Sequence, residues 1–343
     1  MNSRPGRWLD FLVDPVDRRT LSFDGRSLIA GNGIRYPIIE GIPVLLRADV
    51  APTLHGALRT LKLADRARQG EAIDFLAALN RPNSVKEQIR REIAAGSDAA
   101  EAVIRRLVRA TNGYGYRDLS ATDKPPIPQF PQRGTGEHLL DVGCSWGRWT
   151  IAAARAGFRP IGIDPQLGPL LAAKRFASQN GIEIDYICGD ARHLPFKSGA
   201  FERAFSYSTL QHFSDDDCKE ALAEIARVLS EGGRSTIQMA NSAGIRSLWH
   251  QARRGFRVPA EFEVRYRSLP RLLAWFTDAI GATTVSIDCF FGLGLQSSDI
   301  QYMRPLPRIA TRTSEQLKRF DQSLPLLHRF ADSLYFNSTL RSA

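Results

Sequence analysis

The sequence predicts an α/β protein whose main domain is a doubly wound, largely parallel sheet. One observation behind this prediction is that short apolar runs alternate with helical patterns between residues 138 and 242. Another is that tight turns of small residues join the two, as in "LLDVGCSWGRWT". The expected strands are 138–142, 160–163, 184–188, 203–207 and 234–240, and the expected helices lie around 147–156, 167–180 and 215–229.

Two regions precede this domain, which is expected to span residues 138–343. Residues 1–50 are predicted to form a small β-rich unit that ends in "YPIIEGIPVLL". Residues 51–137 show helical apolar spacing up to residue 112, followed by a Gly- and Pro-rich linker over 113–137.

Composition limits the class of protein. With 343 residues and 43% hydrophobic content, the chain can form two or three domains with packed cores. No apolar run reaches the roughly 18 residues of a membrane span, and the N-terminus has no apolar signal-peptide core. The four cysteines are widely spaced, which predicts a reducing, cytoplasmic location without disulfides. No His/Cys cluster has ligand spacing, so no metal site is expected.

The turn after the first strand has the composition of a ligand-binding loop. Gly143 and Gly147 remove side chains where a ligand would approach the backbone. The G-x-G-x-x-G pattern of dinucleotide loops is absent, and the Asp141 carboxylate would repel phosphate but attract an ammonium group. We therefore expect a ligand that joins an amino acid to a nucleoside.

The ends of the following strands supply polar groups for such a ligand, because open α/β sheets bind ligands at this edge. Asp164, before Pro165, is placed to accept hydrogen bonds from two ribose hydroxyls. Asp190 and the N–H of Ala191 are placed to bind adenine. The alternatives are that Asp164 forms a turn and that Asp190 only caps a helix.

Residues 138–242 resemble the class I S-adenosylmethionine-dependent methyltransferases. The segments that carry the resemblance, in the family's order, are "LLDVGCSWG", "GIDP", "GDARHLPF" and "EIARVLSEGGRSTIQM". The resemblance implies a seven-stranded Rossmann-like sheet, S-adenosyl-L-methionine as cofactor, and a direct in-line methyl transfer. The sequence departs from the family at Ser145, where a glycine is usual.

The resemblance also implies roles for individual residues. The cofactor-binding candidates are Asp141, Gly143, Cys144, Gly147, Asp164, Pro165, Asp190, Ala191 and Ser206. Tyr207 and His212, from "FSYSTLQHF", are the catalytic candidates, with packing of either side chain in the core as the alternative. A base is needed only if the acceptor loses a proton.

A second resemblance concerns the N-terminal unit. "LDFLVDPVDRRTLSFDG" and "YPIIEGIPVLL" resemble the small domain of the tRNA-methyltransferase-activator family, whose members often bind zinc through cysteine pairs. Asp14 and Asp17 occupy the place of the first pair, so we expect a variant without zinc. The alternative is a packing module without a separate role.

The basic charge is concentrated after the fifth strand. The net charge is +10, and the insertion at about 243–275 holds seven arginines against two glutamates. The substrate-binding candidates there are Arg253, Arg254, Arg257, Trp249 and Tyr266. Arginine forks suit phosphate or carboxylate, which favours a small, glycan or lipid-linked anionic acceptor. The alternatives are a solvated basic helix, an RNA methyltransferase acting on tRNA or rRNA, and a non-catalytic scaffold that binds the cofactor.

Overall fold

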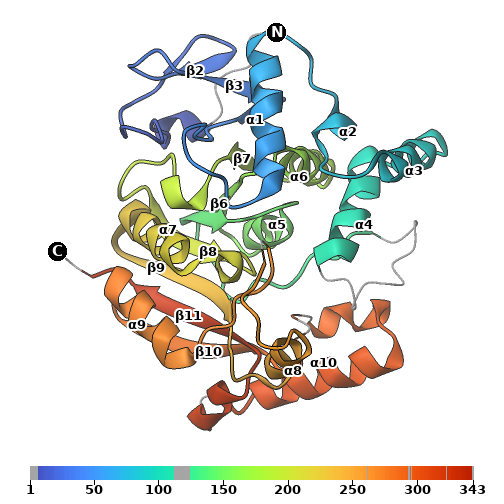
Figure 1. The fold of residues 1–343 in the computed structure, drawn as a ribbon, viewed down its shortest axis with the longest axis vertical. Coiled ribbons are helices and arrows are strands. Elements are labelled where there is room, and N and C mark those ends of the chain that lie inside the picture. The colour runs from blue at the N-terminus through green and yellow to red at the C-terminus, as the bar shows by residue number, and fades with distance from the viewer. Residues whose placement is uncertain are drawn as a thin grey trace.

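The computed structural model describes residues 7–111, 124–260, 262–292, 294, 296–321 and 323–341. At its centre lies a seven-stranded sheet with strand order β10-β11-β9-β8-β5-β6-β7 (Figure 1). Its strands are β5 (His138–Val142), β6 (Arg159–Asp164), β7 (Asp185–Cys188), β8 (Phe201–Ser206), β9 (Leu229–Ala240), β10 (Thr283–Cys289) and β11 (Ser333–Thr339). β11 runs in the direction opposite to the other six strands of this sheet, which are parallel to one another. The predicted mostly parallel, doubly wound sheet is confirmed.

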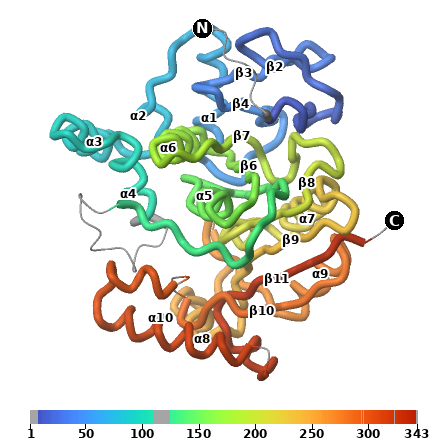
Figure 2. The backbone as a smooth tube through the Cα atoms, turned by 180° about the vertical axis from the view of Figure 1, so that it is seen from behind, coloured from blue at the N-terminus to red at the C-terminus, as the bar shows by residue number. Residues whose placement is uncertain are grey.

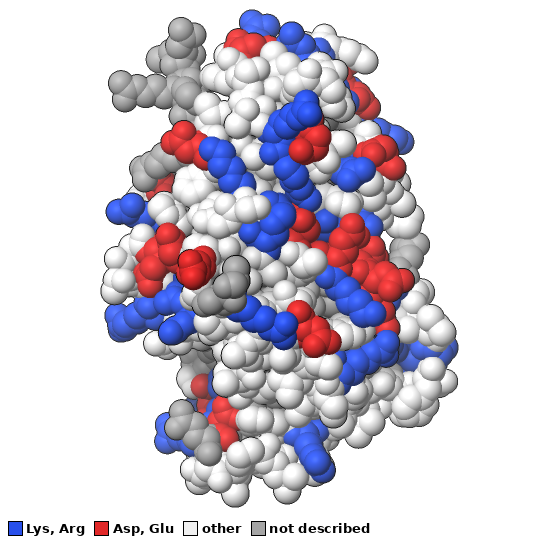
Figure 3. All heavy atoms as spheres, turned by 90° about the vertical axis from the view of Figure 1, so that its left-hand side faces the viewer, with Lys and Arg blue, Asp and Glu red and all other residues white. Residues whose placement is uncertain are grey.

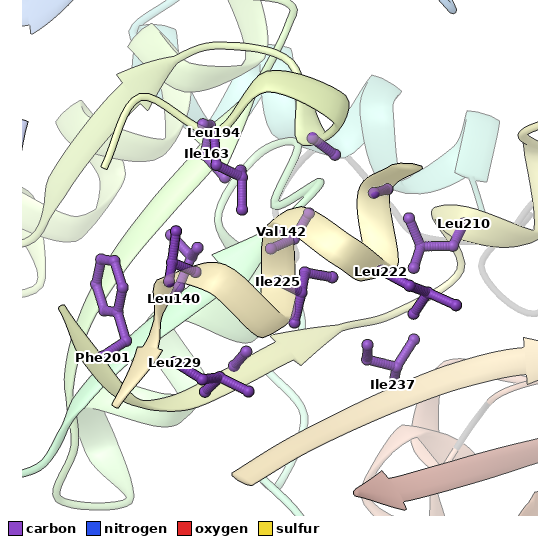
Figure 4. Packing of buried hydrophobic residues seen from close by; sticks show 14 of the residues in the cluster. Leu140, Val142, Ile163, Leu194, Phe201, Leu210, Leu222, Ile225, Leu229 and Ile237 are labelled. Carbon is purple, nitrogen blue, oxygen red and sulfur yellow. The ribbon is translucent and has the colours of Figure 1, made fainter. Parts of the chain in front are cut away.

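Helices cover both faces of the sheet. On one face lie α5 (Arg148–Arg155) and α6 (Leu167–Gln179), and on the other lie α7 (Asp215–Val228) and α9 (Leu269–Ala279). Alternate strand residues point to opposite faces, so Leu140 and Val142 pack against Leu222 and Ile225 of α7 (Figure 4). Leu139, the residue before Leu140, points to the opposite face and packs toward α5.

The N-terminal unit is joined to the edge of this sheet. It contains η1 (Arg7–Asp10) and an antiparallel sheet of β1 (Ser22–Phe23), β2 (Ser27–Ile29), β3 (Arg35–Ile39) and β4 (Ile42–Pro43). Beyond β4, the Leu45 N–H donates to the carbonyl of Cys188 on the edge strand β7 at 2.7 Å. Trp8, Leu12 and Tyr36 share one hydrophobic cluster with the main sheet. The unit thus covers an exposed strand edge and packs into the same core.

Four helices connect the two sheets: α1 (His55–Arg68), α2 (Phe75–Ala78), α3 (Asn83–Ala94) and α4 (Ala99–Thr111). They pack into one cluster with α6, as Figure 2 shows from behind. Most of the first half of the predicted linker, 113–123, lies outside the described residues, and 124–137 runs to β5 without helix or strand.

The C-terminal region adds further helices beside β10 and β11. It contains α8 (Ile245–Arg253), η4 (Ser297–Tyr302), α10 (Pro305–Lys318) and η5 (Pro325–Arg329). Two short turns, η2 (Ala191–His193) and η3 (Leu210–His212), follow β7 and β8. Of the helices described, none is long and apolar enough to cross a bilayer.

Candidate active site

The carboxyl ends of β5, β6, β7 and β8 meet where the strand order reverses. β5 pairs with β6 on one side and with β8 on the other, and such a switch point is where open α/β sheets bind ligands. A cavity of about 420 Å³ lies there, within the range of roughly 300–1,000 Å³ typical of small-molecule sites. Its walls come from the segments after these strands, together with Thr53 and Leu54 before α1 and Phe262 of the insertion.

The loop after β5 lines the cavity largely with backbone. Gly143 has a φ of +77°, and a Cβ there would collide with the side chain of Thr209. Ser145 has a φ of +48°, a left-handed conformation that costs residues with a Cβ roughly 1–2 kcal/mol. That cost gives a physical reason for the glycine usual at this place. Cys144 also lines the cavity, and burial raises the pKa of its thiol, so it stays protonated.

Asp164 and Pro165 lie at the end of β6, in the cavity wall. The Asp164 carboxylate is fixed by two backbone N–H groups: Oδ1 accepts from Gln166 at 2.9 Å and Oδ2 from Ser145 at 3.0 Å. Each oxygen keeps a further acceptor position, so the geometry suits two hydroxyl donors. Burial raises the pKa of Asp164 to about 6.

Asp190 and Ala191 follow β7 and line the same cavity. The Asp190 carboxylate caps η2 and holds Arg192, accepting its backbone N–H at 2.9 Å and its guanidinium at 2.7 Å. Asp190 therefore caps a short helix, as the alternative interpretation expected, and it also borders the cavity. Much of the carboxylate's hydrogen-bonding capacity is used inside the chain, and its contact with adenine stays a prediction.

Three predicted cofactor residues, Asp141, Gly147 and Ser206, lie behind the cavity wall. Asp141 faces α5, because of the alternation along β5, and accepts a 2.6 Å hydrogen bond from Thr150. Burial raises its pKa to about 7. Ser206 Oγ donates to the Val142 carbonyl at 2.8 Å, and a Cβ at Gly147 would collide with the Tyr186 hydroxyl. None of the three is among the residues that line the cavity, and their contact with the cofactor stays a prediction.

A second cavity, of about 600 Å³, adjoins the first. It lies between the carboxyl ends of β9 and β10, the beginning of β11 and the insertion, which includes α8. Tyr207, Ser208, His212 and Phe262 line both cavities. Two molecules, one bound in each cavity, would therefore meet at this shared wall.

The two catalytic candidates stand in this wall with different hydrogen-bonding states. The Tyr207 hydroxyl donates to Asp288 Oδ2 at 2.9 Å, and burial raises the pKa of Tyr207, so it stays protonated and is no base. Burial lowers the pKa of His212 to about 4. Its buried Nδ1 has no hydrogen-bond partner among the described residues. His212 is therefore neutral near pH 7 and able to accept a proton.

The structure divides the candidates of the insertion into two groups. Arg254 and Tyr266 line the second cavity. Arg253, Arg257 and Trp249 are exposed outside it, and Arg257 pairs with Glu263 at 2.7 Å. Along α8 the helical period turns Trp249 and Arg253 away from the cavity, while Arg254, the residue that follows the helix, faces it.

Several lining residues were not predicted. In the second cavity, His250 and Arg246 lie one and two turns before Arg254, the residue that follows α8; both belong to the basic insertion but were not among its substrate-binding candidates. Asp288 and Asp332 come from β10 and the start of β11, strands that carried no clear signal. In the first cavity, Arg148 begins α5 with its guanidinium 5.3 Å from the Trp149 ring centre.

Comparisons with known proteins agree with this geometry. Residues 139–233 match the family model described as a methyltransferase domain. The methyltransferase GfsG of Streptomyces halstedii is 28% identical over 173 residues, which cover 46% of this chain and 61% of that protein. The O-methyltransferase resE of Aspergillus sclerotiorum is 35% identical over 106 residues, or 30% of this chain and 39% of that protein.

A solved structure, the YcgJ protein of Bacillus subtilis, aligns with a TM-score of 0.42 at 21% identity over 62% of this chain and 95% of that one. The chain thus spans less than two thirds of the length of GfsG and resE. These likenesses do not support the predicted resemblance of residues 1–50 to the activator family, since the matched model begins at Leu139. The match over residues 139–233 and the methyltransferases among the relatives support a class I S-adenosylmethionine-dependent methyltransferase domain in this part of the chain.

Proposed function

We propose that the whole protein transfers a methyl group from S-adenosylmethionine to a small anionic acceptor. The observation that carries this proposal is the shared wall of Tyr207, Ser208, His212 and Phe262 between the two cavities. Donor and acceptor would meet there, and such positioning alone supplies a large part of the rate of a direct transfer.

The residues of the first cavity fit the cofactor. Asp164 presents fixed carboxylate oxygens for the ribose, and Gly143 leaves space for close backbone approach. Arg148 supplies a buried positive charge in the same cavity, suited to the carboxylate of the methionine moiety. When bound, S-adenosylmethionine supplies an electrophilic methyl group.

The chain's own residues would then orient the acceptor and receive its proton. Neutral His212 is placed to accept a proton from an acceptor hydroxyl or amine at the shared wall. Asp288 holds the Tyr207 hydroxyl and also accepts from Ser333 Oγ at 2.7 Å. This network fixes Tyr207 as a wall of the site and leaves His212, whose lowered pKa makes it a weak base, as the group placed to receive the acceptor's proton.

The second cavity indicates the chemistry of the acceptor. Arg246 and Arg254 bring positive charge to its α8 side, whereas burial lowers the pKa of His250 between them. The buried Nε of Arg254 has no hydrogen-bond partner among the described residues. Asp332, also in the cavity wall, is buried, and its Oδ2 has no hydrogen-bond partner among the described residues either. An acceptor with an anionic group and a hydroxyl or ammonium donor would satisfy both, because unpaired buried polar groups are costly. A sugar acid or a phosphorylated, lipid-linked glycan has these groups.

Labelled methyl transfer tests the proposal. The purified protein and S-adenosylmethionine with a radioactive methyl group are incubated with extracts separated into RNA, lipid, glycan and small-metabolite fractions. We expect label in an anionic glycan, lipid-linked or small-metabolite fraction, and less label with Asp164→Asn at a cofactor concentration near the wild-type Kd. Label confined to RNA would contradict the acceptor class, and cofactor binding without transfer to any fraction would contradict the activity.

A further inference from the structure

Helix α8 has a second face that takes no part in the cavity. Arg246, His250 and Arg254 point inward, whereas Ile245, Leu248 and Trp249 are exposed. The spacing of three and four residues places these apolar side chains in one row along the helix. A 47% exposed leucine beside exposed isoleucine and tryptophan is unusual for a helix that packs on a protein core.

The turn after α8 continues this apolar row. The Phe256 N–H closes the helix by bonding to the Gln251 carbonyl at 2.9 Å, and Gly255 has a left-handed φ of +62°. In such caps the residue at the position of Phe256 usually packs back onto the helix. Here the ring of Phe256 is 68% exposed instead, so the cap extends the row outward.

The segment η5 lies beside the start of α8. Asn241 Nδ2, four residues before the helix, donates to the carbonyls of His328 and Arg329 at 3.1 Å each. Leu326 and Phe330 are exposed in this segment. We call Ile245, Leu248, Trp249, Phe256, Leu326 and Phe330 the docking face. Single exposed apolar side chains are ordinary, but a group of six on adjoining elements is typical of an interaction surface.

The charges around the docking face are basic. Arg253 and Arg329 are exposed beside it, and α8 contains arginines at 246 and 253 but no acidic residue. The helix α10 lies at the same end of the molecule (Figures 1 and 2) and exposes Arg308, Arg312 and Arg319. Figure 3 shows that this lower end carries mostly uncharged side chains with few charged ones. Apolar side chains flanked by arginine suit the headgroup region of an anionic bilayer.

We propose that the docking face binds the surface of membranes that contain anionic phospholipids. The apolar row enters the interfacial region while Arg253 and Arg329 contact phosphate groups, and the cavity on the inner side of α8 then lies next to the membrane. This surface goes beyond the proposed methyl transfer and does not depend on which acceptor is methylated.

Vesicle flotation with the full-length protein and no cofactor tests the proposal. We expect the protein to float with phosphatidylcholine vesicles that contain phosphatidylglycerol, and to stay unbound with phosphatidylcholine alone. Ile245→Ser with Leu248→Ser should lower binding by about tenfold. Ile34→Ser with Leu58→Ser is the matched control, because these side chains are 42% and 44% exposed. Ile34 precedes β3 and Leu58 belongs to α1, two elements that lie at the opposite end of the molecule from α8 (Figure 1). Arg253→Glu should lower binding by about fivefold, and Arg133→Glu, at an exposed loop arginine, should not.

Three outcomes would overturn the proposal. They are failure to float with anionic vesicles, equal losses in the test and control variants, and a dimer in sedimentation velocity that the Ile245/Leu248 variant dissociates. The dimer would assign the face to a second copy of the chain. Loss of methyl transfer with vesicle binding intact would instead contradict the proposed function alone.

Discussion

The imidazole of His212 lies against the ring of Phe262, with ring centroids 3.9 Å apart and planes 12° from parallel. His212 comes from the turn after β8, and Phe262 comes from the insertion after β9. This stack closes the wall that the two cavities share and withdraws the imidazole from water. Burial is the main reason that the pKa of His212 falls to about 4.

His212 should make the stability of the protein depend on pH. Because its folded pKa of about 4 is below the ordinary 6.5, the native state resists protonation. Its contribution is complete above pH 6.5 and is lost as the pH falls toward 4. The stability of the wild type relative to His212→Gln should therefore fall by up to about 3 kcal/mol between pH 7 and pH 4.

Urea unfolding at a series of pH values measures this difference. His55→Gln, at an exposed histidine, is the control. If the difference in unfolding free energy between wild type and His212→Gln stays constant with pH, the imidazole is not desolvated as described. For an acceptor that loses a proton, His212→Gln should also lower kcat.

Asp164 should control cofactor affinity. Its two oxygens are held by Ser145 and Gln166 for charged hydrogen bonds to hydroxyls. Asp164→Asn should weaken S-adenosylhomocysteine binding by about 1–3 kcal/mol, and wild-type affinity should rise as the pH rises through the Asp164 pKa of about 6. Isothermal titration calorimetry measures both, with NAD as a ligand that should not bind. NAD binding without a response to S-adenosylhomocysteine would refute the cofactor assignment.

The strands that the sequence predicted have strong local signals. β5 and β6 are continuous apolar runs that end in an aspartate or a glycine turn, and buried parallel strands look like this in any context. β10 and β11 were not predicted, because β10 is partly exposed and the two strands are separated by α10 and two 3-10 turns. Their pairing depends on contacts distant in the sequence, and with them Asp288 and Asp332 were missed.

The site residues follow the same division. Asp164 and Ala191 were identified because a strand end fixes where the next residue lies. Asp141 does not line the cavity, because strand alternation turns it toward Thr150 of α5, an orientation that the motif alone does not reveal. For Arg253 and Arg257 the composition suggested a site, but the helical period decides which arginines face the cavity.

The N-terminal unit should stabilise the whole protein. Leu12 is 2% exposed in the core that this unit shares with the main sheet. Leu12→Ala should lower the free energy of unfolding by about 2–5 kcal/mol and shift one cooperative transition, seen equally by circular dichroism and by loss of S-adenosylhomocysteine binding. Val16→Ala, at a 42% exposed valine of the same unit, should change stability by less than about 0.5 kcal/mol. Two separate transitions would mean that residues 1–50 fold as an independent domain.

Arg254 and Arg257 should differ in their effect on the acceptor, although both belong to the same basic segment. Arg254 lines the second cavity with a buried Nε and donates to the Val264 carbonyl at 3.1 Å. Arg257 lies outside and is held by Glu263. Arg254→Gln should therefore raise the KM for the acceptor. The expected loss of acceptor binding free energy is about 1.5–3 kcal/mol, because a desolvated charged contact is lost.

Arg257→Gln should leave that KM unchanged, since an exposed ion pair contributes little. Steady-state kinetics with the labelled acceptor fraction measures both variants, and S-adenosylhomocysteine affinity should stay at the wild-type value in each. If both arginines raise KM equally and the effect disappears with added salt, the segment acts as a diffuse basic surface. If Arg254→Gln also loses cofactor binding, its role is to hold the insertion in place and the acceptor is bound elsewhere.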